Sequence, residues 1–294
     1  MKVLQIGAPR SGNFWLWRIL QQIIERAGLP NGSVVRSHPI HKVADSLELS
    51  HDRQADIDML DILPSRHVWR VSSVWRMPIA DVPSYVDRVD HVWTHSRFCP
   101  ASPAVFDAFD RIVYICRDPR DRALSSARYA FTPYMLRYFP HGEPDPETWL
   151  DHRFADHVRD WMWHVFDHLR YRDRFDIHVL FYERLLHAFD RTLDRLLAYL
   201  DVDLPRTERE AIRRAVTFET MRRQNPDHVR EGRSERWRRQ MSDRRLGRTV
   251  EIAGPMLDLL DYARDRRAPP LDERSLPSVP AGLERGAIEQ YVPT

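Results

Sequence analysis

Near its N-terminus the chain reads Lys2-Val3-Leu4-Gln5-Ile6-Gly7-Ala8-Pro9-Arg10-Ser11-Gly12-Asn13-Phe14-Trp15. The apolar run of residues 2–6 predicts a short buried strand, and the apolar spacing of residues 14–26 predicts a helix. The glycine-bearing loop of residues 7–12 lies between them. In that setting, several backbone N–H groups point to one spot at the positive end of the helix, which suits a phosphate or a sulfate. A plain strand–helix turn without a ligand is the alternative.

The spacing of Gly7 and Gly12 is that of a nucleotide-triphosphate loop, but the residues that follow are different. That motif continues with Lys and then Ser or Thr, which bind the terminal phosphates and magnesium. Asn13 and Phe14 stand in those places. The sequence therefore argues against an ATPase, a GTPase or an ordinary kinase.

Length and composition limit the remaining choices. The chain has 294 residues, of which 43% are hydrophobic, so it can fill the core of one large domain or of two small ones at most. A net charge of +2 argues against nucleic-acid binding through bulk charge. Two cysteines, Cys99 and Cys116, are too few for a disulfide framework or a four-thiolate zinc site. Neither a membrane span nor a signal peptide is expected, so a cytoplasmic protein is the default prediction.

Short apolar runs alternate with amphipathic stretches along the chain. This pattern predicts an α/β fold with a central, mainly parallel sheet flanked by helices. We expect one domain over residues 1–267 and an extended, proline-rich tail over 268–294. Residues 41–90 are hard to assign. Strands are expected at 2–6, 33–36, 69–74, 89–94, 111–116 and 177–182, and helices at 14–26, 121–130, 151–171 and 183–200.

Residues 8–15 resemble the 5′-phosphosulfate loop of sulfotransferases that use 3′-phosphoadenosine 5′-phosphosulfate (PAPS). The usual pattern of that family is Y-P-K-S-G-T-T-W. Four positions match, namely Pro9, Ser11, Gly12 and Trp15. The family's lysine is replaced by Arg10, and its two threonines by Asn13 and Phe14. Taken alone, this loop would be a weak match, but further segments follow in the family's order.

Residues 111–121 are similar to the family's 3′-phosphate motif, a strand that ends in R-x-x-x-D with a serine eight residues after the arginine. Arg117, Asp121 and Ser125 occupy those positions. A guanidinium at the end of a strand can form two hydrogen bonds to a phosphate. The alternative is that Arg117 and Asp121 simply pair with each other.

Trp93-Thr94-His95 resembles the family's K-T-H segment, which supplies the catalytic histidine. A histidine at a strand end can act as a general base because its pKa lies near the working pH. His38 is a rival, because Arg36 precedes it and Pro39 follows it, but its spacing to Arg117 does not fit the family.

Three later segments complete the resemblance. Residues 179–185 look like the V-L-Y-Y-E-D-L strand, in which Tyr182 takes the place of the tyrosine that meets the adenine. Thr217 and Phe218 begin a segment similar to S-F-x-x-M. Residues 230–238 match R-K-G-x-x-G-D-W-K at the arginine, the first glycine and the tryptophan, but Glu231 replaces its lysine.

The chain thus resembles a PAPS-dependent sulfotransferase of the cytosolic, small-molecule type. The resemblance implies PAPS as donor, 3′-phosphoadenosine 5′-phosphate (PAP) as product, and an acceptor hydroxyl from which His95 takes the proton while Arg10 stabilises charge. No metal is expected. The residues implied in cofactor binding are Arg10, Ser11, Gly12, Asn13, Phe14, Trp15, Arg117, Ser125, Tyr182, Thr217, Phe218, Arg230 and Gly232.

The acceptor is left open by the sequence. Residues 41–90 and 129–149 match no nucleotide motif, so we assign them to the acceptor site by elimination. A phenol, an alcohol or a glycan-type small molecule would suit it. The alternatives are a non-catalytic PAP-binding protein on the same fold, a phosphotransferase and, through the arginine run of 230–248, a nucleic-acid binder. The oligomeric state is not predicted.

Overall fold

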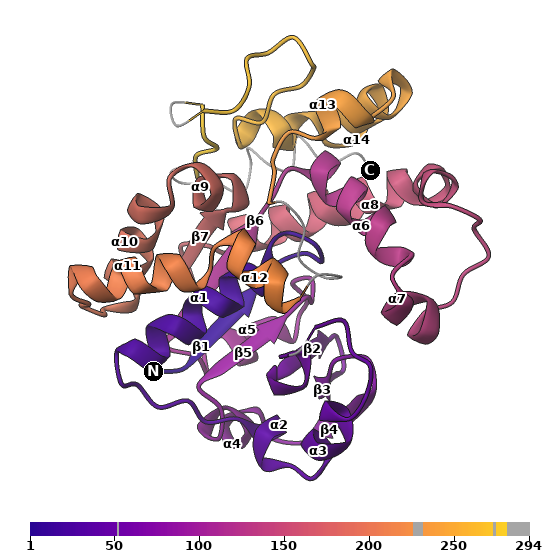
Figure 1. Cartoon of the computed structure of the whole chain (residues 1–294). Coiled ribbons are helices and arrows are strands. Elements are labelled where there is room, and N and C mark those ends of the chain that lie inside the picture. Colours follow the sequence, from indigo (N-terminus) through magenta and orange to yellow (C-terminus); the bar gives the residue numbers. More distant parts are fainter. Residues whose placement is uncertain (52, 226–231, 273–274, 281–294) are drawn as a thin grey trace.

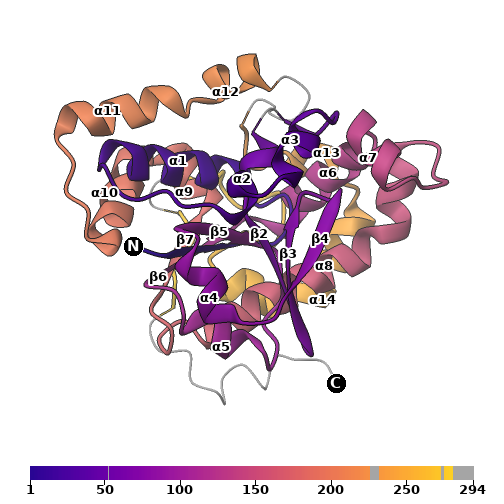
Figure 2. The same ribbon diagram turned by 90° about the horizontal axis from the view of Figure 1, so that it is seen from below.

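The computed structural model describes residues 1–51, 53–225, 232–272 and 275–280. Within these ranges, seven strands form one mixed sheet in the order β4-β3-β2-β5-β1-β6-β7. Helices cover both faces of the sheet (Figures 1 and 2). The strands are β1 (Val3–Ile6), β2 (Met59–Leu63), β3 (Arg66–Val71), β4 (Trp75–Ile79), β5 (His91–Thr94), β6 (Arg111–Cys116) and β7 (Ile177–Phe181).

The centre of the sheet is parallel, as the sequence predicts. Strand β1 pairs in parallel with both β5 and β6, and β6 pairs in parallel with β7. Val3, Leu4 and Ile6 are fully buried because helices lie against both faces of β1. The segment that the sequence left unassigned forms the other half of the sheet. There β2 pairs in parallel with β5, and β3 and β4 extend the sheet as antiparallel strands.

Each face of the sheet has its own helices. Apolar side chains of α1, α10 and α11 form one core cluster with strand residues such as Val113 and Ile115. Helices α5, α8 and α14 contribute to a second cluster with Leu4 and Tyr114. Figure 2 shows α1 and α8 on opposite sides of the sheet. The helices are α1 (Asn13–Arg26), α2 (Val34–Ser37), α3 (Ile40–Asp45), α4 (Val82–Asp87), α5 (Ser102–Phe106), α6 (Pro119–Ala130), α7 (Pro133–Tyr138), α8 (Pro146–Arg170), α9 (Tyr182–His187), α10 (Phe189–Leu200), α11 (Arg206–Ala215), α12 (Phe218–Gln224), α13 (Trp237–Gln240) and α14 (Asp243–Leu259), with a 3-10 turn, η1 (Gln54–Asp56).

The strand predicted at 69–74 lies three residues earlier, as β3 over Arg66–Val71, and two other predicted elements differ in kind or continuity. The predicted strand at 33–36 is wrong, because this segment begins helix α2. The Ser33 side chain accepts a hydrogen bond from the Arg36 amide and so caps that helix. The helix predicted over 183–200 is interrupted at Ala188, where φ is −140°, and forms the two helices α9 and α10.

The described part of the C-terminal segment lies on the domain. Leu276 is buried, and the Arg184 Nε donates to the Pro277 carbonyl at 2.8 Å. Arg238 donates to the Ala268 carbonyl at 3.0 Å. A domain boundary at residue 267 stays a prediction. In the described ranges, no helix has both the length and the apolar character needed to cross a bilayer.

Several histidines are buried within the fold. The Tyr114 hydroxyl lies 3.0 Å from His164 Nδ1, and the rings of His164 and His168 stack with their centroids 4.6 Å apart. Burial lowers the pKa of His168 to about 4 and that of His91 to about 3. Burial is also the main cause of a lowered pKa at His51, His67, His95, His157, His164 and His178.

Because these histidines have lowered pKa values in the folded protein, we expect mild acid to destabilise it. Between their folded pKa and the ordinary value of 6.5, the unfolded chain binds protons that the folded chain does not, so the free energy of unfolding falls as the pH falls. Asp58 and Asp121, whose pKa values burial raises to about 6, and Glu183, whose pKa burial raises to about 7, act in the opposite direction but are fewer. From pH 7.5 to 5.5 we expect a net loss on the order of 3 kcal/mol, measured by urea unfolding with tryptophan fluorescence. A gain in stability over this range would contradict the expectation.

Candidate active site

A cavity of about 390 Å³ lies where the parallel strands end. Gly7 follows β1, His95 follows β5, Arg117 follows β6 and Tyr182 follows β7, so the four segments meet at one edge of the sheet. Most of the predicted site residues line this cavity. They are Arg10, Gly12, Asn13, Phe14, Trp15, His95, Arg117, Ser125, Tyr182, Phe218 and Gly232.

The loop after β1 is shaped by close contacts. The Asn13 Nδ2 donates to the Ala8 carbonyl, and the Gln5 Nε2 donates to the Asn13 carbonyl, both at 2.8 Å. A Cβ on Gly7 would lie 2.2 Å from the Asn13 side-chain oxygen, so only glycine fits there. Gly12 has φ +99° and directs the chain into α1. The loop is thereby wrapped tightly in front of the N-terminus of that helix.

The N-terminus of α1 keeps its anion-binding capacity. Among the described residues, no side chain caps it, and its first turn has no acidic residue. Leu16 is the first residue of the helix whose amide bonds back to the loop, at the Gly12 carbonyl. Helix N-termini of this kind bind phosphate in other proteins.

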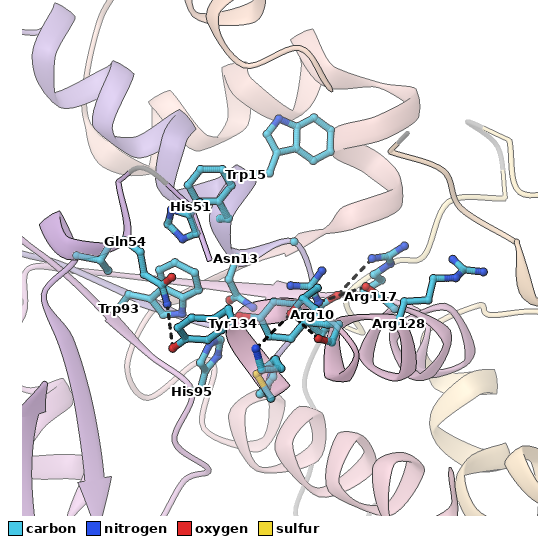
Figure 3. A pocket seen from close by; sticks show the side chains of 18 of the residues that line it. Arg10, Asn13, Trp15, His51, Gln54, Trp93, His95, Arg117, Arg128 and Tyr134 are labelled. Atoms are coloured by element: carbon cyan, nitrogen blue, oxygen red, sulfur yellow. Dashed lines mark hydrogen bonds between the residues drawn. The ribbon is translucent and has the colours of Figure 1, made fainter. Parts of the chain in front are cut away.

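Arg10 lies at the mouth of this loop and is held from two sides. Its Nε donates to Ser125 Oγ at 3.3 Å, and its guanidinium lies 4.2 Å from the centre of the Tyr129 ring. Its backbone has φ 68°, an uncommon value for a residue other than glycine. Figure 3 shows Arg10 between the two ends of the cavity, with His51, Gln54, Trp93, His95 and Tyr134 at one end and Arg117 and Arg128 at the other.

Arg117 connects three segments of the site. Its Nη1 donates to the Arg10 carbonyl at 3.3 Å, its Nη2 donates to the Arg233 carbonyl at 3.2 Å, and its guanidinium lies 4.0 Å from the centre of the Tyr182 ring. Asp121 accepts a hydrogen bond from the Trp237 amide at 3.0 Å. Burial raises the pKa of Asp121 to about 6, and the charge of Arg117 opposes this shift. Arg117 and Asp121 are therefore close, but their hydrogen bonds go to backbone groups.

Aromatic rings form the wall beside α12. The ring centres of Trp15 and Phe218 are 4.5 Å apart, and Tyr182 meets Trp15 edge-on at 5.7 Å. The Trp15 Nε1 donates to the Val216 carbonyl at 3.0 Å, which fixes the plane of the indole. Gly232 has φ +57°, and a Cβ there would lie 2.1 Å from the Phe218 ring. This wall offers flat apolar surfaces to a planar ligand.

His95 faces the cavity in its neutral form. Its Nδ1 lies 2.6 Å from the Gly7 carbonyl, to which it must donate. The lone pair is then on Nε2, as a general base requires. Burial lowers the pKa of His95 to about 4, and the positive charge of Arg70 acts in the same direction. The rival His38 does not line the cavity, since its ring packs against Trp69 at 5.4 Å.

Two predicted cofactor residues, Ser11 and Thr217, do not line the cavity. Ser11 is buried, and its amide donates to the Ala8 carbonyl at 3.2 Å. Thr217 caps α12 through its hydroxyl, which accepts from the Thr220 amide at 3.1 Å. Arg230 lies outside the described residues.

The cavity also contains residues that the sequence did not single out. Arg128 and Tyr129 follow Ser125 by about one turn of α6, so helical spacing from that serine would have indicated them. Burial lowers the pKa of His51 to about 3, and its ring lies 4.2 Å from that of Phe14. Gln54 and Arg70 come from the segment without a motif, where no local signal was available.

The chain matches a known protein family. The family model described as "Sulfotransferase domain" matches residues 1–254. The chain belongs to the sulfotransferase family. It is accordingly a PAPS-dependent sulfotransferase, an enzyme that moves a sulfuryl group from PAPS and leaves PAP. No curated protein matches the chain in sequence.

Solved structures of sulfotransferases share the fold. The mouse sulfotransferase SULT7A1 complexed with PAP has 17% sequence identity and a TM-score of 0.56, with 87% of this chain and 83% of that chain covered. Retinol dehydratase in complex with androsterone and inactive cofactor PAP also has 17% identity and a TM-score of 0.56, over 92% of this chain and 83% of that chain. Retinol dehydratase in a complex with retinol and PAP has 16% identity and a TM-score of 0.56, over 91% and 83%.

The sulfotransferase has no ready-made metal centre in the part of the chain that the structure describes, since no three His, Cys, Asp or Glu side chains are grouped for an ion. Whether the reaction proceeds without a metal stays a prediction.

Gly12→Ala tests the strain in the loop. A Cβ on Gly12 would lie 2.7 Å from the Tyr182 ring, in a backbone conformation that alanine rarely adopts. We expect a loss of about 1–3 kcal/mol in the free energy of unfolding, measured by chemical denaturation. Gly142→Ala is the control, because a Cβ at Gly142 meets nothing within 4 Å. Equal stabilities of the two variants would contradict this account of the loop.

Proposed function

We propose that the enzyme transfers the sulfuryl group of PAPS to a hydroxyl group of a small-molecule acceptor, with His95 as general base. The observation that carries this proposal is the neutral His95, whose Nδ1 is bound to the Gly7 carbonyl in the same cavity as Arg10 and the uncapped N-terminus of α1. The base, a cation and a set of anion-binding amides are thus available to one reacting group.

The cofactor would lie along the cavity from the loop to α12. Amides of residues 11–14 would hold the 5′-phosphate, and Arg117, Ser125, Arg230 and Gly232 would hold the 3′-phosphate. Trp15, Tyr182, Thr217 and Phe218 would surround the adenine. The aromatic wall and the position of Arg117 at the end of β6 support this assignment. Ser11 and Thr217 would contribute less than the sequence suggested, because their amide and hydroxyl already have partners.

His95 and Arg10 would divide the chemistry between them. His95 Nε2 accepts the proton of the acceptor hydroxyl as its oxygen forms a bond to sulfur. The bond from sulfur to the bridging oxygen breaks, and PAP leaves with the electron pair. Arg10 stabilises the negative charge that grows on that oxygen, an interaction that is strongest in the transition state. A guanidinium stays protonated near neutral pH, so Arg10 would supply charge and no proton.

The proteins of similar fold support a small-molecule acceptor. Androsterone and retinol are the molecules bound with PAP in the two retinol dehydratase complexes. The apolar part of this cavity, which includes Phe14, Ile57, Met59 and Trp93, would suit the hydrocarbon body of such an acceptor.

Arg117→Ala tests the nucleotide site. Calorimetric titration should show micromolar PAP binding to the wild type and little binding of ATP, which lacks a 3′-phosphate. The variant loses charge-assisted hydrogen bonds, so PAP affinity should fall about 10- to 100-fold. Arg206→Ala is the control, since that side chain is 91% exposed on α11 and should leave PAP affinity unchanged. Equal binding of PAP and ATP would instead favour the phosphotransferase alternative.

His95→Asn tests the base. The asparagine Nδ2 can still donate to the Gly7 carbonyl, so the loop and PAP affinity should be kept while the lone pair of Nε2 is lost. With labelled PAPS and a panel of phenols, alcohols and glycans, kcat should fall about 10²- to 10⁴-fold. His38→Ala, outside the cavity, should retain the wild-type rate. Wild-type kcat in His95→Asn would rule out the base, and PAP binding without any sulfation would favour the non-catalytic alternative.

A further inference from the structure

A row of side chains crosses the sheet beneath the acceptor end of the cavity. Gln5 on β1 is the register partner of Trp93 on β5, Trp93 is that of Met59 on β2, and Met59 is that of Arg70 on β3. Direct register partners project from the same face of a sheet. Trp93, Met59 and Arg70 all line the cavity, and the Trp93 ring lies 5.2 Å from that of His95. The row continues to Arg76 on β4, which does not line the cavity, so Arg70 is the last cavity residue of a row that begins beside the phosphosulfate loop.

Arg70 is anchored but keeps donor groups for a ligand. Its Nε donates to Asp61 Oδ1 at 2.9 Å, and its Nη1 donates to the Ser72 carbonyl at 2.5 Å. Among the described residues, its Nη2 has no hydrogen-bond partner, although the side chain is only 14% exposed. A largely buried guanidinium with free N–H groups toward a cavity favours a ligand oxygen at that point.

The charges around the cavity favour an anionic oxygen. Six arginines and no acidic residue are among its described lining residues. Arg10, Arg117, Arg128, Arg233 and Arg236 surround the positions proposed for the phosphates or the sulfuryl group. Arg70 lies on β3, which β2 and β5 separate from β1 and its loop, so it is the guanidinium left for the acceptor. Asp61 offsets its charge in part but occupies only its Nε.

We propose that Arg70 selects acceptors that carry a carboxylate in addition to the hydroxyl that is sulfated. The enzyme would therefore act on hydroxy acids, phenolic or aliphatic, in preference to neutral or amine-bearing hydroxy compounds. Strands are spaced about 4.8 Å apart, so the backbones of Trp93 and Arg70 lie about 10 Å apart across two strand spacings. The acid group would thus lie several bonds from the hydroxyl, with the apolar body over Met59. This inference rests on the proposed function and adds the acceptor class to it.

The neighbouring polar groups fit this arrangement. The hydroxyls of Ser72 and Tyr134 are 2.6 Å apart, and Tyr134 also donates to Ser73 Oγ at 3.0 Å. Gln54 Nε2 donates to Ser72 Oγ at 2.5 Å. These neutral groups fix one another and so provide a polar wall that adds no negative charge to that of Asp61.

The test compares acceptors of equal shape and different charge. With labelled PAPS, kcat/KM is measured for 3-(4-hydroxyphenyl)propanoate, its amide and tyramine, and for 4-hydroxybenzoate and 6-hydroxyhexanoate with their amides. The wild type should prefer acid over amide by roughly 10- to 100-fold, mostly through KM, and tyramine should be the poorest substrate. Arg70→Met should abolish this preference, and Arg70→Lys should restore part of it. Asp61→Asn should increase it, because Arg70 is then less neutralised.

PAP affinity and thermal stability of each variant separate this proposal from the one on which it rests. Arg70 is not in the proposed nucleotide site, so PAP should bind to Arg70→Met as to the wild type. If PAP binds and the wild type uses acids and amides equally, or sulfates none of these probes, the carboxylate assignment is overturned and the nucleotide site stands. The carboxylate assignment is also overturned if Arg70→Met lowers kcat/KM for acids and for amides by the same factor. If the wild type binds no PAP, the proposed function fails and this inference fails with it.

Discussion

Four strands, β5, β1, β6 and β7, run side by side in one direction, so their carboxyl ends meet at a single edge. The residue that follows each strand is thereby brought to the cavity: His95, Gly7, Arg117 and Tyr182. Open α/β sheets bind ligands at this edge because the loops there are free to vary while the strands hold them in place. The hydrogen bond from His95 to the Gly7 carbonyl and the bond from Arg117 to the Arg10 carbonyl then join neighbouring loops across the edge. The geometry of the site consequently depends on the pairing of these strands.

Arginine in place of lysine at position 10 changes how the loop must be supported. A lysine presents a compact charge on a flexible stem, whereas a guanidinium is planar and must be held in a fixed orientation to direct its donors. Here the Tyr129 ring lies against its face and Ser125 Oγ accepts from its Nε. Both partners come from α6, the helix that begins directly after Arg117 and Asp118. In the proposed arrangement, the same helix would orient the cation at the sulfuryl group and carry Ser125 toward the 3′-phosphate, and so would couple the two halves of the cofactor site.

Sequence reasoning succeeded where the local pattern and the long-range structure agree. The runs 111–116 and 177–181 are almost wholly apolar because they are covered on both faces, and each is followed at once by a site residue. The sequence prediction was wrong at residues 33–36. Two adjacent valines there suit a strand as well as a helix, and the hydrogen bond by which Ser33 caps α2 favours the helix. Strand β3 contains Arg70 at a cavity position, and β2 contains Asp61, its ion-pair partner, so that charged residues interrupt the apolar alternation of both strands. The role proposed for Arg70 depends on its pairing with Met59, a contact that no local motif encodes.

The charges near the cavity bear on the strength of His95 as the proposed base. The pKa of His95 is lowered to about 4 by burial and by positive neighbours such as Arg70. A base with so low a pKa would hold the acceptor's proton poorly. In the proposed mechanism, PAPS would bring negative charge to Arg10 and Arg117, and an acidic acceptor would bring more to Arg70. Negative charge beside Arg70 would offset one of the positive charges that lower the pKa of His95, while burial, the main cause of that shift, would persist. His95 would therefore be a stronger base with an acidic acceptor bound, at the stage when a proton has to be taken.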